Sequence, residues 1–277
     1  MKILNKEMLL DAGGVRIGMM TIRSPEIASK ARPGQFIVLM ASEKGERVPL
    51  TVVERDLSKG TIKLIFQEAG LTTKILGAMK AGDSLYSLVG PLGHPTEIKK
   101  YGKVIIVGGG VGIAEIYPVA KAMKEAGNHV TTILGARSKD LLILENELKS
   151  VSSEFYVATD DGSYGRKGFT TDILEELLGK GRYDLVYSVG PIPMMKRSSM
   201  VTKKFNAKTI VSLNAIMVDA TGMCGCCRVT VGGKTYFSCV DGPEFDASLV
   251  DWEELMKRNK IYDDKEKHIC KLNIPKI

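Results

Sequence analysis

Four of the five cysteines of this chain lie within 16 residues, and this cluster constrains the fold more than any other feature of the sequence. Cys224, Cys226, Cys227 and Cys239 are interspersed with glycines, which is typical of a loop that leads into a tight turn. Thiolates this close together repel one another unless a metal neutralises their charge, and soft sulfur ligands select zinc, copper(I) or iron–sulfur clusters. We therefore expect this segment to fold around a metal centre.

The spacing within the cluster indicates which residues hold the metal. A closed zinc site and a [2Fe–2S] cluster both need four ligands, and plant-type [2Fe–2S] sites use the spacing C-x4-C-x2-C…C. Cys224, Cys227 and Cys239 match the last three positions of that pattern, whereas Asp219 stands where the first cysteine is expected. Because a carboxylate oxygen can ligate iron, the sequence predicts a [2Fe–2S] site with one aspartate and three cysteine ligands.

Two other arrangements use the same residues. One is a zinc site with Asp219 or Cys226 as its fourth ligand, and the other is a group of disulfides. An odd total of five cysteines, four of them clustered, fits a reducing cytoplasm, in which disulfides are rare. Cys226 stays open as a spare thiol or an alternative cluster ligand.

Length and composition limit the class of protein. A chain of 277 residues predicts two domains with room for a small third. The net charge of +7 comes from scattered basic residues, which suits a solvated surface or docking to an acidic redox partner. Aromatic residues make up only 6% and no nucleic-acid recognition motif is present, so we expect no nucleic-acid binding. The sequence shows neither a signal peptide nor an apolar run of about 18 residues, which predicts a cytoplasmic protein without a membrane span.

Short alternating segments dominate residues 1–97. The segments 15–22, 35–40, 50–53, 61–67 and 84–88 are rich in β-branched or aromatic residues and are bounded by glycine, proline or charged residues. This pattern predicts an antiparallel β-barrel or sandwich. A short helix is expected over 72–79, and the N–H groups and hydroxyls at its N-terminus suit a pyrophosphate.

Three pieces of this region together resemble the FAD-binding barrel of the ferredoxin–NADP reductase superfamily. Residues 47–51 match the family's R-x-P-[LFY]-[ST] strand, residues 70–73 its pyrophosphate-binding turn, and residues 89–93 the loop that closes the barrel. The resemblance implies a bound FAD. The FAD contacts that it implies are Arg47, Pro49, Leu50, Thr51, Gln67, Gly70, Thr72 and Thr73.

Strands and helices alternate over residues 98–212. The apolar run 103–108 predicts a buried strand, and a glycine-rich turn and a helix to about residue 126 follow it. Pro118 lacks an N–H group, so we expect the regular helix to begin near it. Further strands and helices alternate in the same way, which predicts an α/β nucleotide-binding domain with its ligand at the carboxyl ends of parallel strands.

The glycine-rich turn departs from the common dinucleotide-binding fingerprint. Ile113 stands where the third glycine is expected, and Arg137 follows the second strand where a ribose-binding acid is usual. The residues therefore leave NAD and NADP both open. In the reductase superfamily this unit binds a nicotinamide nucleotide. The NAD(H) contacts implied by the resemblance are Gly109, Gly110, Val111, Gly112, Asp161, Gly162, Gly190 and Pro191.

Residues 213–277 form the predicted cluster-binding domain and a charged tail. Residues 227–239 predict a hairpin that turns at Gly232-Gly233 and brings Cys239 back towards the other cysteines. A loop over 241–246 and a short helix over 251–258 are expected after it.

The order of the predicted domains, 1–97, 98–212 and 213–277, is itself specific. It is similar to the electron-transfer subunit of type B dihydroorotate dehydrogenase, although that family carries cysteine where Asp219 stands. The ligand set with Asp219 and the segments 216–224 and 239–246 resemble the small (alpha) subunits of NADH-dependent reduced ferredoxin:NADP⁺ oxidoreductases. This second resemblance covers nearly the whole chain.

The resemblance implies an electron-bifurcating complex. A larger subunit with FAD and [4Fe–4S] clusters forms a heterodimer with this chain and reacts with NADPH and ferredoxin, so ferredoxin is an indirect partner. Single electrons pass to the [2Fe–2S] cluster of this chain and then to its FAD, which exchanges hydride with NAD(H). No acid or base catalyst is implied, because the protein groups position cofactors. The alternatives are a dihydroorotate dehydrogenase electron-transfer subunit and a zinc-stabilised nucleotide-binding sensor.

Overall fold

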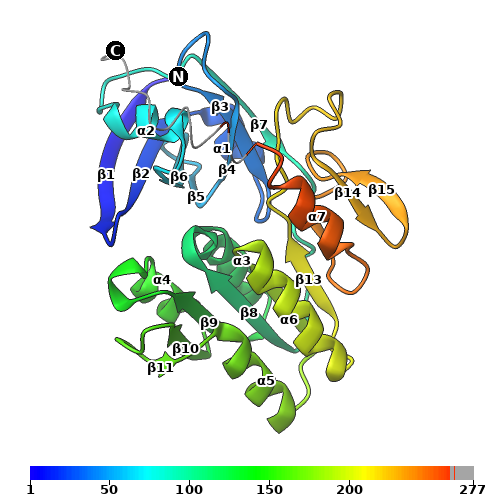
Figure 1. The fold of residues 1–277 in the computed structure, drawn as a ribbon. Coiled ribbons are helices and arrows are strands. Elements are labelled where there is room, and N and C mark those ends of the chain that lie inside the picture. Colours follow the sequence, from blue (N-terminus) through cyan, green and yellow to red (C-terminus); the bar gives the residue numbers. More distant parts are fainter. Residues whose placement is uncertain (263–264, 266–277) are drawn as a thin grey trace.

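The chain folds into an antiparallel β part and an α/β part, and residues 213–262 lie beside both (Figure 1). A computed structural model describes residues 1–262 and 265. Apart from Lys265, the charged tail expected from residue 263 therefore lies outside the described residues.

Residues 3–92 form two antiparallel sheets with an apolar core between them. One sheet has the order β1 (Ile3–Ala12), β2 (Val15–Arg23), β6 (Thr61–Gln67), β5 (Glu54–Asp56), and the other β4 (Val48–Thr51), β3 (Phe36–Met40), β7 (Ser87–Leu92). Ile22, Ile37, Leu39 and Leu64 are fully buried in this core. The predicted antiparallel architecture is confirmed, and α1 (Pro25–Lys30) and α2 (Leu71–Ala78) are its helices.

Strand β1 has no counterpart in the sequence prediction because its apolar alternation is weak. Only Ile3 and Leu10 of its ten residues are buried. The strand lies at the edge of its sheet, where β2 is its one neighbour among the described strands. Sequence periodicity reports burial on one face, so an edge strand this exposed gives little signal.

The α/β part is built on a seven-stranded sheet. Its order is β11 (Arg166–Lys167), β10 (Glu154–Thr159), β9 (His129–Ala136), β8 (Lys103–Gly109), β12 (Leu185–Val189), β13 (Thr209–Ser212), β16 (Glu244–Asp246). All neighbouring strands are parallel except β13 and β16. Alternate residues of β8 pack with α3 (Ile113–Glu125) and α4 (Glu145–Val151) on one face and with α5 (Thr170–Lys180) and α6 (Ile192–Lys204) on the other. Helices on both faces are typical of a parallel sheet.

Two predictions for these elements are wrong. Helix α3 begins at Ile113, and Pro118 lies inside it. Ile113 and Ile116 are fully buried, and their burial offsets the backbone hydrogen bond that Pro118 cannot donate. Residues 241–246, expected as a loop, contain the three-residue strand β16, which pairs antiparallel with β13. So short a strand has no periodicity of its own, and only its partner strand defines it.

The predicted hairpin is formed by β14 (Arg228–Val231) and β15 (Lys234–Phe237). Gly232 and Gly233 make the turn with φ angles of +58° and +75°, which favour glycine at both positions. Helix α7 (Trp252–Arg258) packs against β14 and α6. The hairpin and α7 thereby support the loop that carries the cysteines.

The division into residues 1–97, 98–212 and 213–277 stays a prediction. Strand β16 belongs to the last segment yet completes the sheet of the second. One buried apolar cluster joins Phe36 of β3, Met195 of α6 and Cys227 of the C-terminal segment. The three segments therefore share interfaces. In the described part of the chain, no helix is long and apolar enough to cross a membrane.

Candidate functional site

Asp219 and Cys224 lie together in the loop between β13 and β14. The Asp219 carboxylate accepts hydrogen bonds from the backbone N–H of Thr221 (2.9 Å) and from that of Cys224 (3.1 Å). The Thr221 N–H group stabilises the charged form and lowers the pKa of Asp219. An anionic oxygen is therefore held beside the first cysteine of the loop.

Cys227 and Cys239 form the buried side of the same loop. They are 2% and 1% exposed, and their thiols are neighbours. Burial, and then the adjacent Cys227 thiol, raises the pKa of Cys239 to about 12, while the backbone N–H of Gly222 favours the thiolate. A buried thiol pair of this kind ionises when a cation neutralises it, and hydrogen bonds to sulfur tune iron–sulfur clusters. The chemistry of these two thiols therefore fits an iron–sulfur cluster.

The four residues are arranged as two pairs rather than around one point. Within the described residues, no three side chains of His, Cys, Asp or Glu converge as ligands of a single ion. A [2Fe–2S] cluster shares its four ligands between two irons, so each iron needs two protein side chains. The pairs Asp219–Cys224 and Cys227–Cys239 match that requirement.

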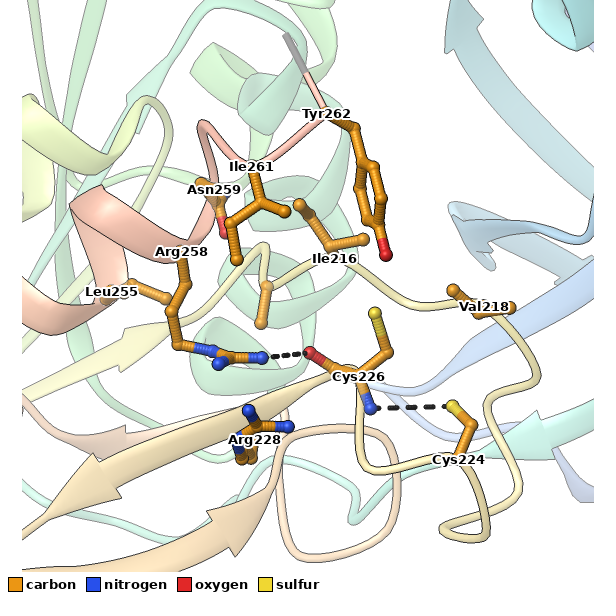
Figure 2. Close-up of a pocket in the computed structure, with 11 residues that line it drawn as sticks. Ile216, Val218, Cys224, Cys226, Arg228, Leu255, Arg258, Asn259, Ile261 and Tyr262 are labelled. Carbon is orange, nitrogen blue, oxygen red and sulfur yellow. Dashed lines mark hydrogen bonds between the residues drawn. The ribbon is translucent and has the colours of Figure 1, made fainter. Parts of the chain in front are cut away.

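Cys226 contributes its backbone to the loop. Its N–H group donates to Sγ of Cys224 (3.5 Å), and its carbonyl accepts from Nη2 of Arg258 (3.0 Å). Figure 2 shows the Cys226 side chain directed away from Cys224, in a pocket of about 370 Å³ that α7 borders. Cys224 lines the same pocket, but the Cys226 thiol is not directed towards that residue.

A cavity of about 540 Å³ lies between the β part and the α/β part, and we term it the flavin cavity. Pro49, Leu50 and Thr51 of β4 and Gln67 at the end of β6, four of the predicted FAD contacts, line it. The opposite wall is the turn Gly110–Gly112 with Gly190, and Met217, two residues before Asp219 in the chain, also lines the cavity. A mainly apolar wall with few polar groups suits a flat aromatic ring.

Arg47, Gly70, Thr72 and Thr73 are not among the residues that line this cavity. Gly70 caps α2, and its N–H group donates to Oγ1 of Thr73 (2.9 Å). The Thr72 hydroxyl donates to the Glu46 carboxylate (2.7 Å). A carboxylate thus takes the hydroxyl that the sequence prediction assigns to a pyrophosphate.

A second cavity of about 580 Å³, termed the nucleotide cavity, adjoins the first at the carboxyl ends of β8, β9 and β10. The two share the lining residues Gln67, Gly109, Gly110, Val111 and Pro191. This edge of a parallel sheet is where such folds bind nucleotides.

Two predicted nucleotide contacts, Asp161 and Gly162, lie in the turn after β10 and outside the lining of the nucleotide cavity. Asp160 lines the cavity instead, together with Arg137 and Arg197. The Arg197 guanidinium stacks on Phe169, 5.0 Å from its ring centroid. Sequence inspection misses Arg197 because it lies in a helix, away from the glycine-rich segments.

Glu115 is the one ionisable side chain among the described residues that line the flavin cavity. It is half-buried, and burial raises its pKa to about 7 although hydroxyls of Ser212 and Thr51 favour its charged form. Sequence inspection misses Glu115 because nothing in a single acid between Ala114 and Ile116 marks it as a cavity residue.

Comparisons with known proteins agree with this arrangement. Residues 214–251 match the family model of the iron–sulfur cluster binding domain of dihydroorotate dehydrogenase B, and residues 106–199 match the oxidoreductase NAD-binding domain. A Thermotoga maritima protein named as a dihydroorotate dehydrogenase B (NAD(+)) electron transfer subunit homolog is 51% identical over 246 residues, which are 89% of this chain and 87% of that protein. The chain belongs to the family of dihydroorotate dehydrogenase B electron-transfer subunits and their homologues.

Solved structures confirm the reductase-like fold of this electron-transfer subunit. An NADH-dependent reduced ferredoxin–NADP oxidoreductase, studied for flavin-based electron bifurcation, has a TM-score of 0.90 and 47% identity over 96% of this chain and 95% of that chain. Ferredoxin–NADP⁺ reductase from Plasmodium falciparum shares the fold alone, with a TM-score of 0.61 and 14% identity over 74% of this chain and 90% of that chain. Both predicted resemblances are confirmed.

The electron-transfer subunit is therefore an oxidoreductase component. The matched domains and the reductase-like fold confirm the predicted cofactor classes, namely an iron–sulfur cluster, NAD and FAD.

Proposed function

We propose that this chain is the electron-transfer subunit of a flavin-based electron-bifurcating NADH-dependent ferredoxin:NADP⁺ oxidoreductase. The observation that carries the proposal is the order of three adjoining sites. The nucleotide cavity and the flavin cavity share Gln67 and Gly110, and Met217, which lines the flavin cavity, stands two residues before Asp219 in the chain. A flavin between the other two cofactors converts between the hydride of a nicotinamide and the single electrons of a cluster. The 47% identity to the NADH-dependent reduced ferredoxin–NADP oxidoreductase of known structure supports this function among those found in the family.

The proposed ligands of a [2Fe–2S] cluster are Asp219, Cys224, Cys227 and Cys239. Their support is the paired arrangement, the anionic state of the aspartate and the buried thiols. The proposed FAD contacts are Pro49, Leu50, Thr51 and Gln67 at the ring, and Arg47, Gly70, Thr72 and Thr73 at the phosphates. The proposed NAD(H) contacts are Gly109, Gly110, Val111, Gly112, Asp161, Gly162, Gly190 and Pro191.

Exposed apolar side chains around the cysteine loop support the proposal that a partner subunit docks there. Val218, Met223 and Val240 are 51%, 88% and 40% exposed, so the loop presents apolar side chains to its surroundings. Exposed apolar patches of this kind mark protein interfaces. We propose that a larger subunit with FAD and [4Fe–4S] clusters docks here as a heterodimer, with ferredoxin as an indirect partner.

A second candidate is the electron-transfer subunit of dihydroorotate dehydrogenase B, because several relatives carry that name. The two functions differ in what drives NAD reduction by the complex purified from cells. We expect NADPH oxidation that requires NAD⁺ and oxidised ferredoxin together. NAD⁺ reduction by dihydroorotate in the same complex would instead establish the second candidate.

Replacing Asp219 with cysteine tests the proposed first ligand. We expect Asp219→Cys to keep a [2Fe–2S] cluster, because a thiolate is the usual ligand at this position, and to shift the midpoint potential of the cluster. Redox titration followed by electron paramagnetic resonance measures both. An unchanged potential and spectrum would mean that residue 219 does not ligate the cluster, and Asp241→Cys is the control that leaves both unchanged.

A further inference from the structure

A pair of acids lies where the three segments of the chain meet, and the cofactor chemistry described above does not use it. Glu115 projects from the first turns of α3 and lines the flavin cavity. Glu244 of β16 accepts hydrogen bonds from the hydroxyl of Tyr187 (2.8 Å) and from that of Thr96. Both carboxyls therefore have hydroxyl groups as neighbours, Tyr187 and Thr96 for Glu244, and Ser212 and Thr51 for Glu115.

The charges around Glu115 and Glu244 favour keeping one proton on these two carboxyls, which lie between the flavin cavity and the core. The titratable groups that face Glu115 are Glu244 from β16 and Tyr187 from β12, while β4 and β13 contribute the hydroxyls of Thr51 and Ser212. In the described part of the chain, no basic side chain is among the groups that shift the pKa of either carboxyl. Burial and then the negative charge of Glu244 raise the pKa of Glu115 to about 7, although the two hydroxyls act in the opposite direction. A carboxyl with such a pKa exchanges its proton near neutral pH.

The proposed function requires a group beside the flavin that accepts and releases a proton. Oxidation of one NADH to NAD⁺ releases two electrons and one proton, all carried by the hydride. An iron–sulfur cluster accepts electrons only, one at a time. One proton is therefore left in the flavin cavity for each NADH oxidised, and one is consumed there for each NAD⁺ reduced.

We propose that the Glu115 carboxylate accepts and returns this proton, with Glu244 as the neighbouring charge that tunes it. The inference rests on the proposed function, because it requires a flavin in this cavity. It is supported by position as well as by charge, since no other described residue lining the flavin cavity is ionisable. The hydroxyls of Thr51 and Ser212 would orient the carboxyl in both protonation states.

The test is the flavin midpoint potential of the full-length protein as a function of pH, in the range of about pH 5 to 9 where a shifted carboxyl titrates. Reduction adds negative charge to the cavity and so raises the pKa of Glu115 further. Above pH about 7 in the wild type, reduction therefore takes up one additional proton, and the midpoint potential falls more steeply with pH. We call this change of slope the break. Glu115→Gln should lose this break and should have a higher potential than the wild type on the alkaline side, with the two curves meeting at low pH.

Three further variants make the result specific. Glu115→Asp should keep a break, because it keeps a carboxyl. Glu244→Gln should keep the break but move it to lower pH, because it removes the charge that raises the pKa of Glu115. Glu125→Gln changes an exposed acid of the same helix and should match the wild type.

The outcomes separate this inference from the proposed function. A protein that binds flavin and keeps the break in Glu115→Gln overturns the proton role and leaves the proposed function standing. A protein that binds no flavin when reconstituted overturns both.

Discussion

Cys224→Ala should lose the whole iron–sulfur absorption of the protein, together with about two irons per chain, as expected for a [2Fe–2S] cluster that lacks one ligand. Cys224 is exposed, so its removal leaves no cavity in the core. The loss would therefore report ligation rather than unfolding. Iron analysis and the visible absorption of anaerobically purified protein measure it.

Cys226→Ala is the matched control, because it makes the same chemical change two residues away. The Cys226 side chain points away from Cys224 (Figure 2), and its backbone contacts to Cys224 and Arg258 survive the substitution. We expect full iron content and an unchanged spectrum. A cluster that persists in Cys224→Ala but disappears in Cys226→Ala would exchange the roles of the two residues.

Gly34→Ala should destabilise the fold strongly. Gly34 has a φ angle of +82°, and a Cβ atom there would meet the Thr96 hydroxyl, lie 2.8 Å from the Thr96 nitrogen and 2.6 Å from a Glu244 oxygen. The left-handed conformation costs about 1–2 kcal/mol and overpacking about 1–3 kcal/mol, so we expect a loss of about 2–5 kcal/mol in the free energy of unfolding. Denaturant titration of the purified protein measures this loss.

Gly14→Ala separates the two contributions. Gly14 has a similar φ angle of +73°, but a Cβ atom there would have nothing within 4 Å. It should therefore lose only the conformational part, about 1–2 kcal/mol. Equal losses in the two variants would show that the contact between Gly34, Thr96 and Glu244 is not tightly packed.

Features that depend on neighbours in the sequence could be predicted from it. The apolar run 103–108 becomes β8, and Gly232-Gly233 becomes a tight turn because both residues adopt positive φ. The spacing from Asp219 to Cys239 likewise predicts four ligands for one cluster, which stays a prediction, and the fold of the loop places these residues in two pairs. In each case the determining residues lie within one short segment.

Features that depend on distant partners could not be predicted in this way. Strand β16 exists because β13 offers it an edge, and Pro118 is accommodated because the residues before it are buried. Glu115 and Glu244 belong to separate segments that only the folded chain brings together. The acid pair is therefore visible in the structure and not in the pattern of residues.

The most direct test of the account is one absorption spectrum of the full-length protein purified without oxygen, with iron, zinc and flavin counted in the same sample. We predict flavin bands superimposed on broad iron–sulfur absorption, with about one flavin and about two irons per chain, as one flavin site and a [2Fe–2S] cluster require. A colourless protein that contains zinc and no flavin, produced under conditions in which iron–sulfur clusters assemble, would contradict the account. That result would favour a zinc-stabilised nucleotide-binding module.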